Sequence, residues 1–86
     1  MSTVIVEHEW NAKDGEKVFK VVGSIVEMSK NGKLPKGFSL KSVDVIAGSP
    51  RAICRWEAPS AEALSGLLSQ VNPPTKHRVV ETQKVL

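Results

Sequence analysis

The sequence predicts an α+β domain with the element order β-α-β-β-α-β. Three observations lead to this fold class. Apolar residues alternate with a period of two in several segments, apolar residues recur at helical spacing in others, and Ala58-Pro59-Ser60 marks a strand-to-helix junction. The chain of 86 residues suits one modest core, so we expect a single domain over 1–86.

The first strand is expected at Thr3–Trp10, where the residues alternate in polarity. One face of this strand would point to the core: Val4, Val6, His8 and Trp10. The first helix is expected at Glu16–Lys30, with Asp14 as its N-cap and Asn31-Gly32 at its end. Gly23 costs this helix about 1 kcal/mol relative to Ala, which predicts a close contact there.

The second strand is expected at Phe38–Ala47, and the third at Arg51–Ala58. Gly48-Ser49-Pro50 is so short a connection that these strands should be antiparallel neighbours. Ser60 is expected to cap the second helix, and Asn72-Pro73-Pro74 to end it. Its buried stripe would be Leu64, Leu67, Leu68 and Val71. The fourth strand is expected at His77–Leu86.

This order favours a ferredoxin-like sandwich, in which a four-stranded antiparallel sheet carries both helices on one face. The first and third strands would lie at the centre of the sheet. The other face would carry apolar residues together with charges able to pair: Ile5, Glu7, Ile53 and Arg55. Such a mixture suits a sheet-to-sheet interface better than bare solvent, so we expect a homodimer through this face.

Composition narrows the class of protein. The net charge of +3 arises partly from lysines around one loop, which is more typical of a solvated face than of a nucleic-acid track. Nucleic acid is therefore not an expected partner. The apolar runs are too short to cross a membrane, no basic and then apolar leader is visible, and the single Cys suits a reducing compartment. These features predict a cytoplasmic protein.

Two stretches carry a family resemblance. Val-Ile-Val-Glu-His at 4–8 and Cys-Arg-Trp-Glu-Ala-Pro at 54–59 resemble segments of the small dimeric α/β-barrel proteins. Within that superfamily the chain is most similar to uncharacterised small single-domain families and to related small nickel-binding proteins. The resemblance implies two sheets packed face to face in a dimer, with ligand cavities between each sheet and its helices. Superfamily members include monooxygenases, isomerases and binding proteins, and the fold chooses none of these.

A metal site is one hypothesis. Imidazole and thiolate ligands suit nickel, zinc or copper, and the resemblance to nickel-binding proteins implies His8 and Cys54 as ligands. His77 joins them from topology alone, because the start of the fourth strand should share a sheet edge with the end of the first. The alternative is that Cys54 is a small buried hydrophobe and that each His is merely hydrogen-bonded.

A small-molecule site is the second hypothesis. The aromatic residues expected to line a pocket between helices and sheet are Trp10, Trp56, Phe19 and Phe38, with His8 as its polar or acid–base group. Large apolar residues at such positions are also ordinary core. The sequence therefore predicts a homodimeric protein that binds a small ligand or a transition metal, with a small cofactor-free monooxygenase or isomerase as the alternative.

An RNA-binding module is the weakest hypothesis. RNA-recognition domains share this element order and expose aromatic residues on their two central strands. Arg51–Ala58 lacks the glycine–aromatic alternation of their third strand, and only Trp56 matches loosely.

Overall fold

The computed structural model describes residues 2–83 and 85. Within them the elements follow the predicted order. They are β1 (Ser2–Glu9), the short 3-10 helix η1 (Ala12–Asp14), α1 (Gly15–Lys30), β2 (Ser39–Val45), β3 (Arg51–Ala58), α2 (Ala61–Val71) and β4 (Lys76–Glu81). None of the helices described is long and apolar enough to cross a membrane.

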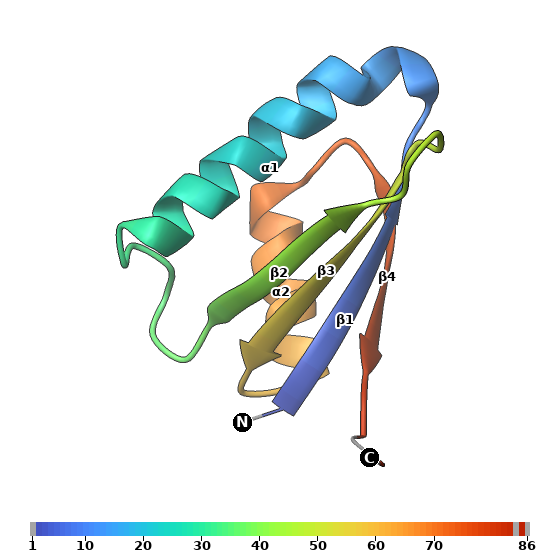
Figure 1. Ribbon diagram of the computed structural model, residues 1–86. Coiled ribbons are helices and arrows are strands. Elements are labelled where there is room, and N and C mark those ends of the chain that lie inside the picture. Colours follow the sequence, from blue (N-terminus) through green and yellow to red (C-terminus); the bar gives the residue numbers. More distant parts are fainter. Residues whose placement is uncertain (1, 84, 86) are drawn as a thin grey trace.

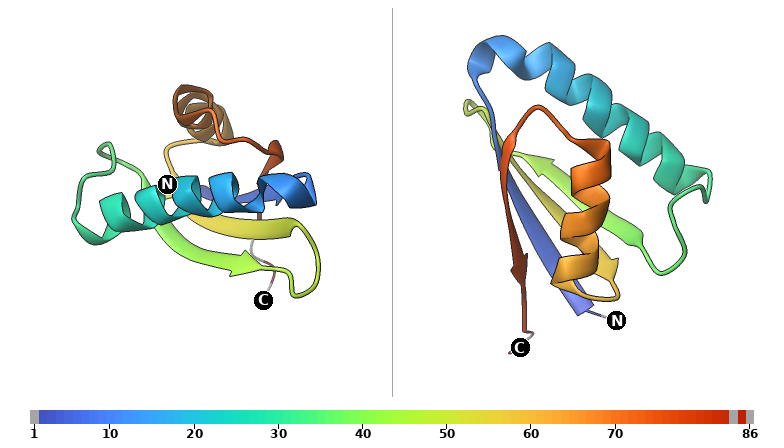
Figure 2. Two further views of the ribbon diagram at one scale, coloured as in Figure 1. Left: turned by 90° about the horizontal axis from the view of Figure 1, so that it is seen from above. Right: turned by 180° about the vertical axis from the view of Figure 1, so that it is seen from behind.

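The strands form one antiparallel sheet in the order β2-β3-β1-β4 (Figure 1). The first and third strands are therefore central, as the sequence predicts. Both helices lie on the same side of the sheet (Figure 2). This confirms the ferredoxin-like α+β fold and leaves one sheet face without helices, which we call the open face.

The register of the central strands decides which residues form the core. Val4 lies opposite Trp56, and Val6 lies opposite Cys54. These four side chains are between 0% and 6% exposed, so the predicted core-facing parity of β1 and β3 is confirmed. Strand residues alternate between faces, so Ile53 and its open-face neighbours point away from the helices.

The core consists of two neighbouring clusters. The larger one joins the central strands to α2, in which Leu64 is fully buried. Burying a leucine side chain contributes about 2 kcal/mol. The smaller cluster contains Trp10, Val18 and Ala52, and it holds the N-terminal half of α1 against the end of the sheet.

Several element boundaries differ from the sequence expectation. β1 ends at Glu9, because the chain turns at Trp10, whose backbone N–H donates to the Pro50 carbonyl over 3.1 Å. β2 ends at Val45, since the hairpin turn begins directly after it. β4 ends at Glu81, well before the predicted residue 86, and residues 84 and 86 lie outside the described part of the chain.

The helix caps were partly predicted. Ser60 caps α2 as expected, because its Oγ accepts a hydrogen bond from the Ala63 backbone over 3.0 Å. Asp14 occupies the N-cap position of α1 as predicted, but its side chain makes no capping hydrogen bond. The 3-10 turn that precedes α1 occupies Asp14, and Asn11 caps that turn instead by accepting from the Lys13 backbone. Gly32 follows α1 at φ 65°, the left-handed conformation expected after the helix.

The close contact predicted at Gly23 is absent among the residues described. A Cβ built at Gly23 meets no atom within 4 Å, because this side of α1 faces solvent. We therefore expect Gly23→Ala to raise the free energy of unfolding by about 1 kcal/mol, since alanine reduces the conformational freedom of the unfolded chain. Urea denaturation measures the difference.

Gly37→Ala is the matched control. Gly37 has φ 93°, and a Cβ there would lie 3.2 Å from Cγ of Pro59, so this substitution should destabilise the protein. Equal effects of the two substitutions would contradict the assignment of Gly23 to open space.

Candidate ligand-binding site

An apolar cavity of about 30 Å³ lies between the helices and the sheet, and we call it the interlayer cavity. Its walls come from α1, α2, the three strands β1, β2 and β3, and the loop before β4. The lining residues are His8, Trp10, Val18, Val21, Val22, Ile25, Leu40, Val43, Ala52, Cys54, Trp56, Leu68, Pro73 and Thr75. The volume holds about two water molecules, so a larger guest requires the walls to move apart.

His8 is the titratable polar group at one end of this cavity. Its Nδ1 lies 3.0 Å from Thr75 Oγ1, which ties the end of β1 to the loop that follows α2. Burial, and to a lesser extent the nearby charge of His77, lowers the pKa of His8. The imidazole is therefore neutral at pH 7. When Nδ1 donates to Thr75, Nε2 carries the lone pair and can accept a proton or a hydrogen bond.

His77 lies directly opposite His8 across the β1–β4 pair, with 6.0 Å between the two ring centroids. The prediction from strand topology that these two residues share one edge of the sheet is therefore confirmed. His77 itself is exposed.

Cys54 lies farther along the sheet, opposite Val6, whereas His8 lies opposite Ala52. Two residues along a strand correspond to about 7 Å. Burial, and then the carboxylate of Asp44, raises the pKa of the Cys54 thiol to about 11. The group therefore stays a neutral thiol at pH 7, which suits packing and opposes nucleophilic chemistry.

The described residues do not bring the three metal ligands expected from the sequence, His8, Cys54 and His77, into one group. Nowhere among them does a group of three His, Cys, Asp or Glu residues gather closely enough to hold a metal ion. His8 and His77 form a pair, and a metal ion at Cys54 would have to displace the proton of a buried thiol. The geometry therefore favours the small-molecule hypothesis.

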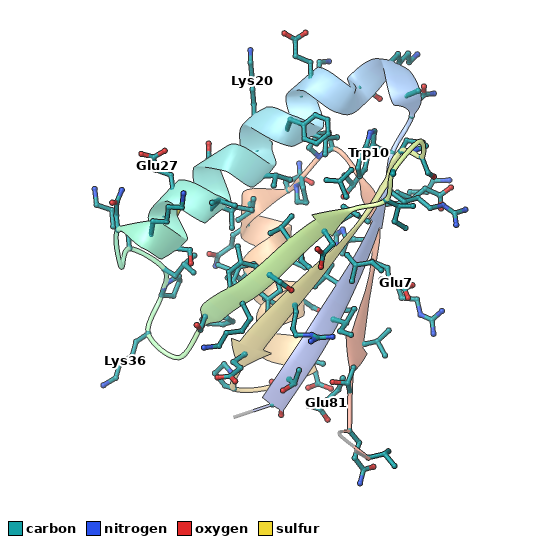
Figure 3. The ribbon with its side chains drawn as sticks, in the orientation of Figure 1. Glu7, Trp10, Lys20, Glu27, Lys36 and Glu81 are labelled. Carbon is teal, nitrogen blue, oxygen red and sulfur yellow. The ribbon has the colours of Figure 1, made fainter. Side chains whose placement is uncertain are left out.

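Trp10 and Phe19 sit at the α1 end of the cavity. Trp10 is 8% exposed and lines the cavity, and Figure 3 shows it beside the N-terminal half of α1, whereas Lys20 and Glu27 point outward. Phe19 packs edge-on against Trp10 with 6.1 Å between ring centroids. It is 52% exposed and is absent from the described lining, so it supports Trp10 from outside the cavity.

Trp56 separates the interlayer cavity from a second hollow. The second hollow has a volume of about 270 Å³ and lies between α1, α2 and the loop after α1; we call it the loop-side groove. Both hollows are bordered by Ile25, Trp56 and Leu68. Trp56 is 2% exposed, yet its Nε1 has no hydrogen-bond partner among the described residues.

Sequence reasoning missed Thr75, the partner of His8. A signal for it existed, because residues 75, 77 and 79 share one parity and β4 begins beside the end of β1. The signal was weak, since Thr75 precedes the regular strand and follows two prolines whose path the sequence does not define.

Comparisons with known proteins support the fold. No family model matches the chain, and no curated protein does. A solved structure described as an antibiotic biosynthesis monooxygenase is similar over 100% of both chains, with a TM-score of 0.62 and 17% sequence identity. At this identity the likeness establishes a shared ferredoxin-like fold and carries no further conclusion about activity.

The lowered pKa of His8 predicts a pH effect on stability. Because its folded-state pKa lies below the usual 6.5, the unfolded chain takes up a proton first as the pH falls. Stability should therefore be lost from about pH 6.5 down through the folded pKa. We expect His8→Asn, which keeps a hydrogen-bonding group for Thr75 but does not titrate, to lose less stability on acidification. Urea midpoints at about pH 8 and about pH 5 measure this difference.

His77→Asn provides the control. It removes the nearby charge, the smaller of the two causes, so the acid-dependent loss should shrink without disappearing. Identical pH profiles for the wild type and His8→Asn would show that His8 titrates normally in the folded protein.

Proposed function

We propose that this protein binds a small, largely apolar molecule between its helices and its sheet. The observation that carries the proposal is the interlayer cavity, in which apolar walls are interrupted at one end by the hydrogen-bonded, neutral His8. Apolar walls with a few placed polar groups are typical of ligand sites. Trp10, Trp56 and His8 then contact the ligand directly, and Phe19 supports Trp10.

Helix α1 provides the means by which the cavity widens. Among the described residues, no side-chain hydrogen bond or ion pair joins α1 to the sheet. The helix is held through apolar side chains, chiefly Val18, Val22 and Ile25. Apolar contacts are not directional, so α1 can shift outward while a ligand replaces the contacts that it gives up.

The proposal predicts the effect of filling the cavity. Ala52→Val adds two methyl groups to its wall and keeps a residue that suits a strand, so it should weaken binding of 1-tetralone, a small bicyclic ketone, by about tenfold or more. Titrations followed by NMR chemical shifts measure the affinity.

Ile53→Val is the matched control, because Ile53 neighbours Ala52 in β3 but points to the open face. It should leave the affinity unchanged. If 1-tetralone, 1-naphthol and 1,4-naphthoquinone all fail to bind the wild type, the proposal is wrong.

A small cofactor-free monooxygenase or isomerase is the second candidate. The observation that favours it is the neutral His8 at the cavity, because the tautomer in which Nδ1 donates to Thr75 leaves Nε2 able to take a proton from a bound hydroxyl or from a carbon next to a carbonyl. The solved structure with the same fold is described as a monooxygenase. The same titrations separate the two functions, because a binding protein returns the ligand unchanged whereas an enzyme consumes oxygen or yields an isomer.

We also propose that two copies associate through the open face. Ile53 is 37% exposed there, and it adjoins residues of mixed character: Ile5, Glu7, Asp44, Arg55, Arg78 and Val80. The described ion pairs beside them are Arg51–Glu9 at 3.8 Å and Lys41–Glu57 at 3.9 Å. Glu7 and Arg55 face Ile53 and Ile5 across the strands, so within one copy they form no described ion pair.

An apolar centre with charges of both signs around it can pair with a second copy of itself about a two-fold axis. The wild type should therefore sediment at twice the 9.3 kDa of one chain. Ile53→Glu, which places a charge in the apolar centre, should shift it to the monomer. Phe19→Lys, at an exposed apolar residue on the helix side, should leave the dimer intact. A wild-type monomer at micromolar concentration would refute this interface.

A further inference from the structure

The structure points to a particular class of ligand for the site proposed above. We infer that the ligand carries a neutral carbonyl oxygen and that the indole N–H of Trp56 donates a hydrogen bond to it. This inference rests on the proposed function, since it concerns the chemistry of the same site. Trp56 is then the residue that determines specificity, and small apolar ketones, quinones and lactones are the ligands.

Folding deprives the indole N–H of Trp56 of a hydrogen bond. In the unfolded chain water accepts a hydrogen bond from the indole, whereas in the folded protein Nε1 is buried without a partner among the described residues. A buried tryptophan N–H usually finds an acceptor, and a donor left without one costs free energy. A ligand that supplies an acceptor therefore recovers a hydrogen bond that folding lost.

Trp56 lies where a ligand would enter the space between the helices and the sheet. Trp56 borders both the interlayer cavity and the loop-side groove. The cavity of about 30 Å³ is too small for an organic ligand, whereas the groove of about 270 Å³ approaches the lower end of ligand pockets, about 300 Å³. Nε1 itself is buried, so a ligand that passes along Trp56 reaches it once α1 has shifted outward.

The surroundings of Trp56 disfavour a charged acceptor. The wall of the interlayer cavity contains no described Asp, Glu, Lys or Arg side chain. Lys33 borders the loop-side groove, but it is exposed whereas Trp56 is buried. A carboxylate or phosphate at Trp56 would lose its water without gaining an opposite charge, which is far more costly than burying a carbonyl. A neutral oxygen is therefore the acceptor that this environment favours.

A matched pair of ligands tests the inference. 1-Tetralone and tetralin have the same two-ring skeleton and differ by the carbonyl oxygen. We expect the wild type to bind the ketone about tenfold more tightly than the hydrocarbon, the effect of one recovered hydrogen bond. Trp56→Phe removes the N–H and should abolish this preference. Trp10→Phe, at the other tryptophan of the cavity wall, should preserve it.

A second measurement does not depend on the folding of Trp56→Phe. The chain has two tryptophans, so its ¹H–¹⁵N spectrum contains two indole signals, which Trp10→Phe assigns. 1-Tetralone should move the Trp56 indole proton downfield, as a new hydrogen bond does, and tetralin should not. If both ligands bind equally and move this signal alike, the inference is wrong and the proposed function stands. If neither ligand binds, the inference is wrong, and the proposed function falls with it only when 1-naphthol and 1,4-naphthoquinone also fail to bind.

Discussion

The structure depends on one constraint, the register of the central antiparallel pair β1–β3. With Val4 opposite Trp56 and Val6 opposite Cys54, all four side chains lie beneath the helices. A shift of one residue would turn them to the open face and place Glu7 or Arg55 in the core. Only Pro59 and Ser60 separate β3 from α2, so this register also sets where the second helix packs. The interlayer cavity, the loop-side groove and the open face all follow from it.

The parts of the fold that local chemistry determines could be predicted from the sequence. Alternation in β3 and the Ser60 cap are examples, because each depends on residues within one short segment. The start of α1 was not predictable in the same way. Asn11 and Asp14 are both good capping residues. In the structure a 3-10 turn precedes α1, and the capping hydrogen bond is made by Asn11 to that turn and not by Asp14 to α1. Helical spacing likewise places Phe19 beside the buried stripe, but the rotation of α1 on the sheet leaves it half exposed.

The candidate site shows the same division. Strand topology was enough to bring His8 and His77 together, since it fixes which strand ends meet at one edge. It was not enough to add Cys54, because shared parity puts a residue on the right face without fixing its distance along the strand. The hydrogen bond between His8 and Thr75 depends on the path of the loop after α2. The sequence does not define this path, because Pro73 and Pro74 end the helix without fixing the direction of the chain that follows. These contacts place His8 as the polar end of an apolar cavity.

Trp56 is the position where packing and hydrogen bonding conflict. Its ring fills the space between β3 and the helices, but its N–H has no described partner. A purely apolar side chain would avoid that cost, and such violations of local consistency are expected chiefly at functional sites. In the ligand-bound form that we infer, a carbonyl oxygen accepts a hydrogen bond from Nε1, and the conflict is removed. Under the proposed binding, the free energy recovered there would also offset part of the cost of moving α1, so one unpaired donor would provide both selectivity for the ligand and part of the driving force for admitting it.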